Sequence, residues 1–126
     1  MKTRIQTKNA PQAIGPYSQA IKVEGMVYCS GQIPLDPETG KLVEGDIGAQ
    51  TARVMENLKA VLVSAGGDLS NIVKTTILLK DLGDFTNVNE VYGSYFSEPF
   101  PARATFEVAR LPMDCNVEIE AIARIN

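Results

Sequence analysis

The residues of this sequence best suited to chemistry are one arginine and two glutamates near its C-terminal end. Arg103 lies in PARATFEVAR, which otherwise looks like a half-buried strand, and a guanidinium fork can bind a carboxylate through two parallel hydrogen bonds. Glu118 and Glu120 are two apart in VEIEA, so in a strand they share a face, where a carboxylate can orient or deprotonate water. Each residue alone is better explained by a solvated surface. A simple hairpin of the last two strands would leave Arg103 and Glu118 out of register.

The absence of histidine limits the chemistry that this chain can perform. With no His among 126 residues, Ser-His and Cys-His nucleophiles and His-bound metals are excluded. No D-x-D or EF-hand spacing suggests a carboxylate metal site, and no Gly-rich segment has P-loop or dinucleotide spacing. Cys29 and Cys115 lack C-x-x-C spacing, so we expect free thiols in a reducing compartment. The sequence therefore predicts a site with neither metal nor cofactor.

Two short motifs offer further groups that a small ligand can contact. Ser30 and Gly31, at the end of YCSGQ, supply a hydroxyl and a backbone N–H that a ligand can approach closely. Tyr17 follows the rigid pair GP and can present its phenol from a loop. The alternatives are a turn at a strand end for the first motif and an anchoring core tyrosine for the second.

The composition is that of an ordinary folded protein. The chain is 44% hydrophobic and 21% charged over 126 residues, which fits one domain spanning 1–126 with a substantial core. The net charge is -3 and the 12 Lys and Arg residues are scattered, so a nucleic-acid partner is not expected. No stretch approaches the roughly 20 apolar residues of a membrane span. We therefore expect a cytoplasmic protein without a membrane partner.

The first half of the chain predicts a hairpin followed by a long helix. Residues 17–23 and 26–32 are strand-like runs with a two-residue break between them, as a hairpin requires. Residues 33–45 indicate a turn-rich loop that can contain a small second hairpin. The spacing of apolar residues becomes helical over 46–65, with Asp46 as the N-cap and two glycines after the end.

The second half alternates strands with one more helix. Residues 71–80 are rich in β-branched side chains and predict a strand. Helical spacing returns over 84–96, with Asp84 as the expected cap, and residues 104–110 and 117–125 predict the last two strands. The order is ββαβαββ, which favours an α+β domain of two layers, a mixed sheet with two helices on one face.

The last predicted strand indicates that the second face of the sheet is also covered. One of its rows is wholly apolar, and Ile122 adds an apolar residue to the other row. A sheet with helices on one face and apolar residues on the other predicts a homo-oligomer packed sheet against sheet. The apolar row consists of Val117, Ile119, Ala121, Ala123 and Ile125.

Five motifs in the same order resemble those of the RidA family, also called YjgF or reactive-intermediate deaminase proteins. They cover nearly the whole chain, from about Asn9 to Arg124. The resemblance implies a chorismate-mutase-like fold and a homotrimer with clefts between subunits, in agreement with the second apolar face. The motifs are AIGPYSQA (13–20), SGQIPLDPETG (30–40), VNEVY (88–92), PARATFEVARLP (101–112) and VEIEAIA (117–123).

The same resemblance implies an activity, the hydrolysis of reactive 2-imino acids such as 2-iminopropanoate and 2-iminobutanoate to 2-oxo acids and ammonia. Arg103 would hold the substrate carboxylate and Glu118 would position the attacking water. A protonated imine carbon is already electrophilic, so its hydration requires neither a metal nor a covalent intermediate. The remaining residues expected to line the cleft are Tyr17, Ser30, Gly31, Asn89 and Thr105.

One departure from the family pattern concerns residue 105. Many members have Cys there, whereas this chain has Thr105, which leaves a backbone N–H contact but no thiol. We therefore expect that the side chain at 105 is not a nucleophile.

Two other functions remain open at the level of sequence. A non-catalytic module that binds small carboxylates and regulates another protein would use the same arginine. RNA cleavage, which some relatives have been said to perform, is disfavoured because the chain is acidic and has no His.

Overall fold

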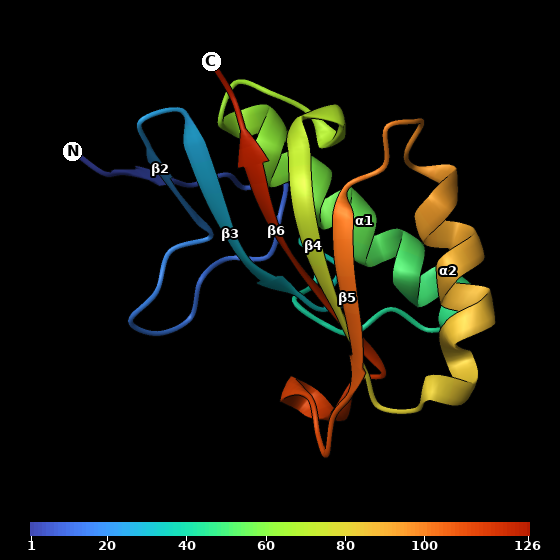
Figure 1. Cartoon of the computed structure of the whole chain (residues 1–126). Coiled ribbons are helices and arrows are strands. Elements are labelled where there is room, and N and C mark those ends of the chain that lie inside the picture. The colour runs from blue at the N-terminus through green and yellow to red at the C-terminus, as the bar shows by residue number, and fades with distance from the viewer.

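A mixed sheet of six strands carries two helices on one of its faces (Figure 1). The strands lie in the order β1-β2-β3-β6-β4-β5, and only β4 and β5 pair in parallel. The computed structural model describes residues 1–126. The elements are β1 (Thr3–Ile5), β2 (Ala20–Val23), β3 (Met26–Gln32), α1 (Ile47–Ser64), β4 (Ile72–Leu79), α2 (Phe85–Ser94), β5 (Ala102–Glu107) and β6 (Val117–Arg124).

The predicted α+β class is confirmed, with one strand that the sequence did not reveal. Strand β1 pairs with β2, but only Ile5 of its three residues is buried, so no alternation marks it. The first predicted strand, 17–23, is shorter than expected because only Ala20–Val23 pair with β3. The observed order is therefore βββαβαββ.

Helix α1 begins and ends where its sequence predicts. Asp46 has an extended backbone, and its Oδ1 accepts a hydrogen bond of 2.9 Å from the N–H of Ala49, as an N-cap should. The helix ends before Gly66, whose φ of +97° lies in the left-handed region that favours glycine. The buried face packs against the sheet and includes Val54, Met55, Leu58, Val61 and Leu62.

Helix α2 lies where it was predicted, but its expected cap is wrong. Asp84 makes no capping hydrogen bond, because it ends a 3-10 turn (Leu82–Asp84) and its own backbone is already helical. An N-cap side chain reaches the free N–H groups only from an extended backbone. Asp81 takes this role one turn earlier and accepts a hydrogen bond of 2.8 Å from Gly83 N–H.

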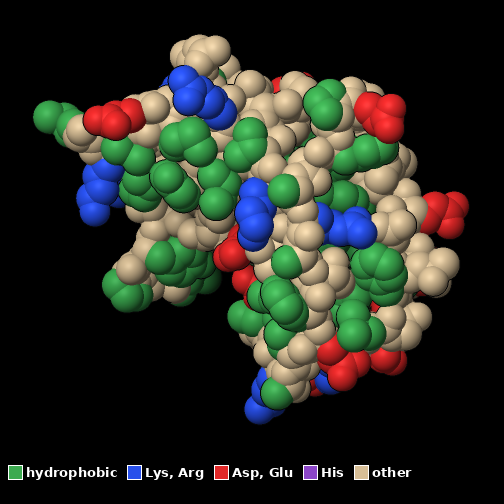
Figure 2. All heavy atoms as spheres, in the orientation of Figure 1, with side chains coloured by type: hydrophobic (Ala, Val, Ile, Leu, Met, Phe, Trp, Pro, Cys, Tyr) green, Lys and Arg blue, Asp and Glu red, His purple; other side chains and the backbone are tan.

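The two faces of the sheet differ in how far a single chain covers them. The predicted apolar row of β6 is buried against α1 along its whole length, whereas Ile122 in the other row is only half-buried. Apolar side chains are exposed on the uncovered face, and Figure 2 shows them beside charged groups. The most exposed of these in the strands are Tyr28, Val73 and Phe106.

Both cysteines are free, as the sequence predicted, and both are buried. Burial raises the pKa of the Cys29 thiol to about 12, and burial also raises the pKa of Cys115. Neither helix is long and apolar enough to cross a membrane.

Candidate functional site

A pocket of about 480 Å³ opens between the loop before β2, the end of β3 and the turn before β6. Four of the residues singled out in the sequence line it together: Tyr17, Ser30, Gly31 and Glu118. We call it the Glu118 pocket. Its other lining residues include Ile33, Leu35 and Met113. Figure 2 shows the corresponding notch in the surface, with acidic atoms along its edge.

Glu118 is a half-buried carboxylate without a partner. Its side chain lies on the face of the sheet that the helices leave open, and no hydrogen bond or salt bridge engages it. Burial, and to a lesser extent the charge of Glu120, raises the pKa of Glu118 above its ordinary value. A carboxyl group with a raised pKa is suited to accepting a proton near neutral pH.

Gly31 gives the Glu118 carboxyl group the space that it occupies. A Cβ built at Gly31 would overlap Glu118 Oε2, so any larger residue must displace the carboxyl group. The glycine lies in an irregularity of the pairing between β3 and β6, where the register shifts between Cys29 and Gln32. The SGQ motif therefore shapes the surroundings of the candidate base.

Tyr17 and Ser30 are fixed by a loop that a buried glutamine anchors. Gln19 is 3% exposed, and its Nε2 donates to the carbonyls of Thr7, Ala10 and Pro11. Ser30 Oγ donates a hydrogen bond of 2.6 Å to Ser18 O, which ties the same loop to β3. The half-exposed ring of Tyr17 therefore lines the pocket from a loop that is tied to β3 and to residues 7–11.

The predicted anion receptor, Arg103, lies in a second hollow of about 410 Å³. Strand β5 begins at Ala102, earlier than predicted, so Arg103 is a strand residue. Helix α2 supplies the opposite side of the hollow, including Asn89 and Tyr92. We call this hollow the Arg103 cleft, and it is also lined by Gly93, Phe100 and Pro101.

The guanidinium of Arg103 is oriented by neutral neighbours. Its Nη1 donates a hydrogen bond of 2.6 Å to Asn89 Oδ1. Its Cζ lies 5.3 Å from the ring centroid of Phe85 and 5.2 Å from that of Tyr92, within the range of cation–π contacts. No carboxylate pairs with it, so its remaining N–H groups stay free to bind an anion.

Arg103 and Glu118 lie on opposite faces of the sheet within one chain. Arg103 pairs with Thr75 on the helix-covered face, whereas Glu118 pairs with Leu78, which faces the other way. Strand β4 lies between β5 and β6, so the hairpin considered for the last two strands does not exist. Within one chain, Arg103 and Glu118 therefore lie in two separate hollows.

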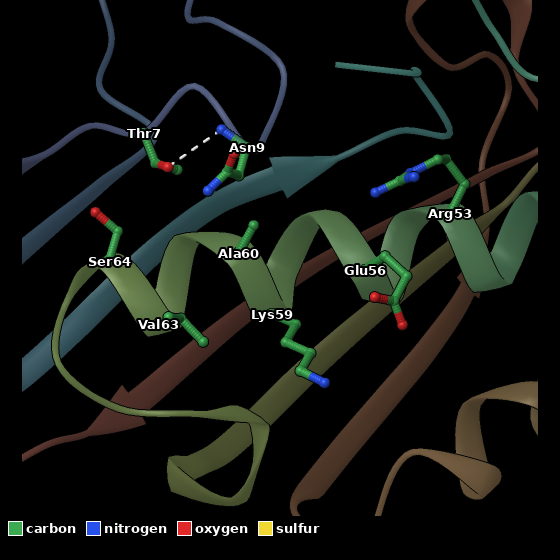
Figure 3. A pocket seen from close by; sticks show the side chains of 8 residues that line it. All are labelled: Thr7, Asn9, Arg53, Glu56, Lys59, Ala60, Val63 and Ser64. Carbon is green, nitrogen blue, oxygen red and sulfur yellow. Dashed lines mark hydrogen bonds between the residues drawn. The ribbon is translucent and has the colours of Figure 1, made fainter. Parts of the chain in front are cut away.

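Two other features remain outside both hollows. Thr105 pairs with Ile77 in the edge strand β5 and lines neither hollow in a single chain. An open groove of about 530 Å³ runs along the outer side of α1, lined by Arg53, Glu56 and Lys59 among others (Figure 3). This groove is larger than the Glu118 pocket, but none of the predicted site residues lines it, so we do not regard it as the candidate site.

Sequence reasoning missed several residues that shape the Glu118 pocket. Gln19 carried no signal, because its hydrogen-bond partners lie up to 12 residues away along an irregular loop. Met113 also lines the pocket, from a left-handed backbone with φ of 56°. Such a conformation is uncommon for a residue other than glycine and cannot be read from the letters LPMD.

The sequence profile of the endoribonuclease L-PSP family matches residues 7–125. A RutC family protein of Pyrococcus abyssi is 58% identical over 119 residues, which cover 94% of this chain and 94% of that protein. The chain belongs to this family, the RidA or YjgF family. The human 2-iminobutanoate/2-iminopropanoate deaminase is 50% identical over 119 residues, covering 94% of this chain and 87% of that protein.

Solved structures of RidA family members share the fold. RidA from an Antarctic Psychrobacter species superposes with a TM-score of 0.94 at 51% identity, over 98% of this chain and 99% of that chain. Escherichia coli TdcF, solved with bound serine, has a TM-score of 0.93 at 44% identity, over 98% and 99% of the two chains. The chain therefore has the same α+β fold as these structures.

Proposed function

We propose that this RidA family member hydrolyses 2-imino acids to 2-oxo acids and ammonia. The observation that carries the proposal is the half-buried, unpartnered carboxylate of Glu118, which has a raised pKa and lies beside Gly31. Relatives that share about half of the sequence are named as deaminases of 2-iminobutanoate and 2-iminopropanoate, which supports the same substrate class for this chain.

The proposed reaction adds one water and releases one ammonia. The substrate enters as the protonated imine. Glu118 accepts a proton from the water as the water oxygen bonds to the imine carbon, and the C=N electron pair moves to nitrogen, which gives a neutral carbinolamine. The protonated carboxyl group then gives its proton to the amino nitrogen, and the carbon–nitrogen bond breaks as the C=O bond forms. The released ammonia takes the remaining hydroxyl proton and leaves as ammonium, so Glu118 ends as a carboxylate.

Arg103 would bind the substrate carboxylate in this scheme. Its free N–H groups and its fixed orientation beside Asn89 match the planar geometry of a carboxylate. Because Arg103 and Glu118 lie on opposite faces of one chain, the complete cleft needs the Arg103 cleft of one copy and the Glu118 pocket of another. We infer a homotrimer, supported by the exposed apolar side chains on the open face.

The other predicted residues have subordinate roles in the composite cleft. Tyr17, Ser30 and Gly31 would line it from the Glu118 side and Asn89 from the Arg103 side. Thr105, two residues after Arg103, would approach the substrate through its backbone N–H when a second copy covers the edge strand β5.

The activity is tested by generating an imino acid in the assay with an amino-acid dehydratase or oxidase. The purified protein should accelerate the appearance of the 2-oxo acid above the rate of spontaneous hydrolysis. A rate equal to that of the buffer would reject the deaminase proposal.

The composite cleft is tested by mixing two inactive variants. Arg103→Ala and Glu118→Gln proteins, unfolded and refolded together, should regain up to about a quarter of the native rate, because random assembly leaves that share of interfaces intact. Mixtures as inactive as the separate variants would show that one chain supplies both groups.

A second candidate function is binding of small carboxylates without catalysis. The bound serine in the Escherichia coli TdcF structure favours it, because serine carries a carboxylate. Calorimetry with a 2-oxo acid distinguishes the two: binding abolished by Arg103→Ala, without any imine hydrolysis, would favour the binding module.

RNA cleavage, which the name of the family profile suggests, is a weaker candidate for this chain. The net charge of -3 repels a polyanion, and the chain lacks the histidine that commonly serves as acid or base. Ribonuclease activity that persists at constant specific activity through successive purification steps would support it.

A further inference from the structure

We propose that Asn57 of α1 is a positioning residue that fixes the Ile33–Leu35 wall of the Glu118 pocket, against which the substrate side chain packs. The inference rests on the proposed deaminase function, because it concerns how the side chain of an imino or oxo acid is recognised.

Asn57 is a polar residue in an otherwise apolar setting. It is 0% exposed, within the face of α1 that packs into the core beside Leu58 and Val61. A buried amide is costly unless it is hydrogen-bonded. Its Nδ2 donates to two backbone carbonyls, at 3.3 Å to Ile33 O and at 3.0 Å to Leu35 O.

The segment that receives these bonds is a tight turn immediately after β3. Leu35 N–H donates to Ile33 O at 2.7 Å across the buried Pro34. Ile33 and Leu35 both line the Glu118 pocket. One side chain of α1 therefore binds the backbone on both sides of Pro34 and sets the position of this part of the pocket wall.

Arg53 fixes the orientation of the Asn57 amide. Its Nε donates a hydrogen bond of 3.1 Å to Asn57 Oδ1, so the oxygen faces the guanidinium and the nitrogen faces the turn. In Figure 3 the Arg53 side chain points away from Glu56 and Lys59, along the groove on α1. Arg53 thus gives a second, more accessible place to disturb the same contact.

The wall lies where the substrate side chain should go. In the proposed function, the substrate carboxylate lies at Arg103 and the imine carbon lies at Glu118. The remaining part of the substrate is its side chain, which must contact another wall of the pocket. The other long aliphatic side chains of the pocket are far less enclosed by the chain, since Ile14 is 87% and Met113 58% exposed. Ile33 and Leu35 are half-buried and held by Asn57, so they form the defined apolar surface.

The test measures how affinity depends on side-chain length in the assembled protein. Calorimetry with pyruvate, 2-oxobutanoate and 2-oxopentanoate should show wild-type affinity rising by up to about fourfold for each methylene that the wall buries. In Asn57→Leu, which has a similar volume but no donor, the increase should fall below about twofold per methylene.

Two further variants separate positioning from general destabilisation. Arg53→Met keeps an apolar side chain at a partly exposed position but removes the donor to Asn57. It should reduce the dependence of affinity on side-chain length less than Asn57→Leu does. If Asn57→Leu does not fold, the Arg53→Met result tests the inference. Thr51→Val is the matched control, because Thr51 is fully buried in α1 but bonds only to Ile47 O of its own helix. It should keep the wild-type gradient.

Three results would overturn the inference: no gradient in the wild type, the same gradient in the Asn57 or Arg53 variants, or equal flattening in Thr51→Val. The proposed function fails separately, if the wild type does not accelerate imine hydrolysis. The gradient is measured with oxo acids, so it remains informative in that event.

Discussion

The Glu118 pocket and the Arg103 cleft differ in how their charged residues are buried and hydrogen-bonded. Glu118 is half-buried and has no partner, so its environment disfavours its charged form. Arg103 is exposed, and an amide and two aromatic rings orient it without neutralising it. The surroundings of the carboxylate therefore favour its protonated form, whereas the surroundings of the guanidinium leave N–H groups free for a ligand.

The largest effect should follow from removing the proposed proton acceptor, Glu118. Glu118→Gln keeps the shape of the side chain and should lower kcat by about 10² to 10⁴, the usual contribution of a general base. The dissociation constant of a 2-oxo acid, measured by calorimetry, should change little. A loss of binding equal to the loss of rate would show that Glu118 is a binding residue and would break the contrast.

Removing the guanidinium should affect binding instead. Arg103→Ala should lower kcat/KM. The loss of transition-state stabilisation that this corresponds to should be on the order of 2 to 5 kcal/mol, as expected when one member of a desolvated charge pair is lost. Arg103→Lys retains the positive charge but lacks the planar guanidinium, so it should recover only part of the lost kcat/KM. Calorimetry should show a matching loss of oxo-acid affinity, and unchanged affinity would contradict the assignment.

A smaller effect should come from adding one methyl group beside the carboxyl group. In Gly31→Ala the Cβ would displace Glu118, and we expect about a tenfold fall in kcat from the misplaced base. Gly48→Ala in the first turn of α1 is the control, because its Cβ would come no closer than 3.3 Å to its nearest neighbour, Asp46 Oδ1, and would not overlap it. The control should keep full activity, and an equally active Gly31→Ala would contradict the close approach.

The smallest effect concerns stability as a function of pH. The pKa of Glu118 is raised on folding, so the native state binds the extra proton and the free energy of unfolding falls as pH rises. The fall should begin near the unfolded-state pKa of about 4.3 and end above the folded-state pKa. Glu118→Gln should therefore be slightly more stable than wild type at pH 7 and equal to it at pH 3 in denaturant titrations. The reverse sign would mean that the carboxylate has a stabilising partner.

Local sequence signals predicted those parts of the fold that depend on local interactions. Asp46 caps α1 because its side chain reaches an N–H only three residues away. Asp84 looked equivalent, but an unforeseen 3-10 turn had already given it a helical backbone. Strand β1 was missed because pairing with β2, and not its own pattern, makes it a strand.

The sequence predicted which residues face the two hollows better than it predicted how the hollows are arranged. Tyr17, Ser30, Gly31 and Glu118 do line one pocket, and Asn89 does contact Arg103. Their division into two hollows depends on β4 lying between β5 and β6, which no spacing within either strand encodes. The polar side chains that hold the walls, Gln19 and Asn57, act over 8 or more residues and gave no local signal.

The burial of both cysteines has a chemical consequence if the chain acts on electrophilic imines as proposed. Sulfur attacks carbon as the thiolate, and a thiol with a pKa of about 12, as at Cys29, forms almost none at neutral pH. Thr105 offers no sulfur near the cleft either. Both thiols are therefore poorly placed to add to an electrophilic carbon, and iodoacetamide should leave the cysteines of the folded protein unmodified.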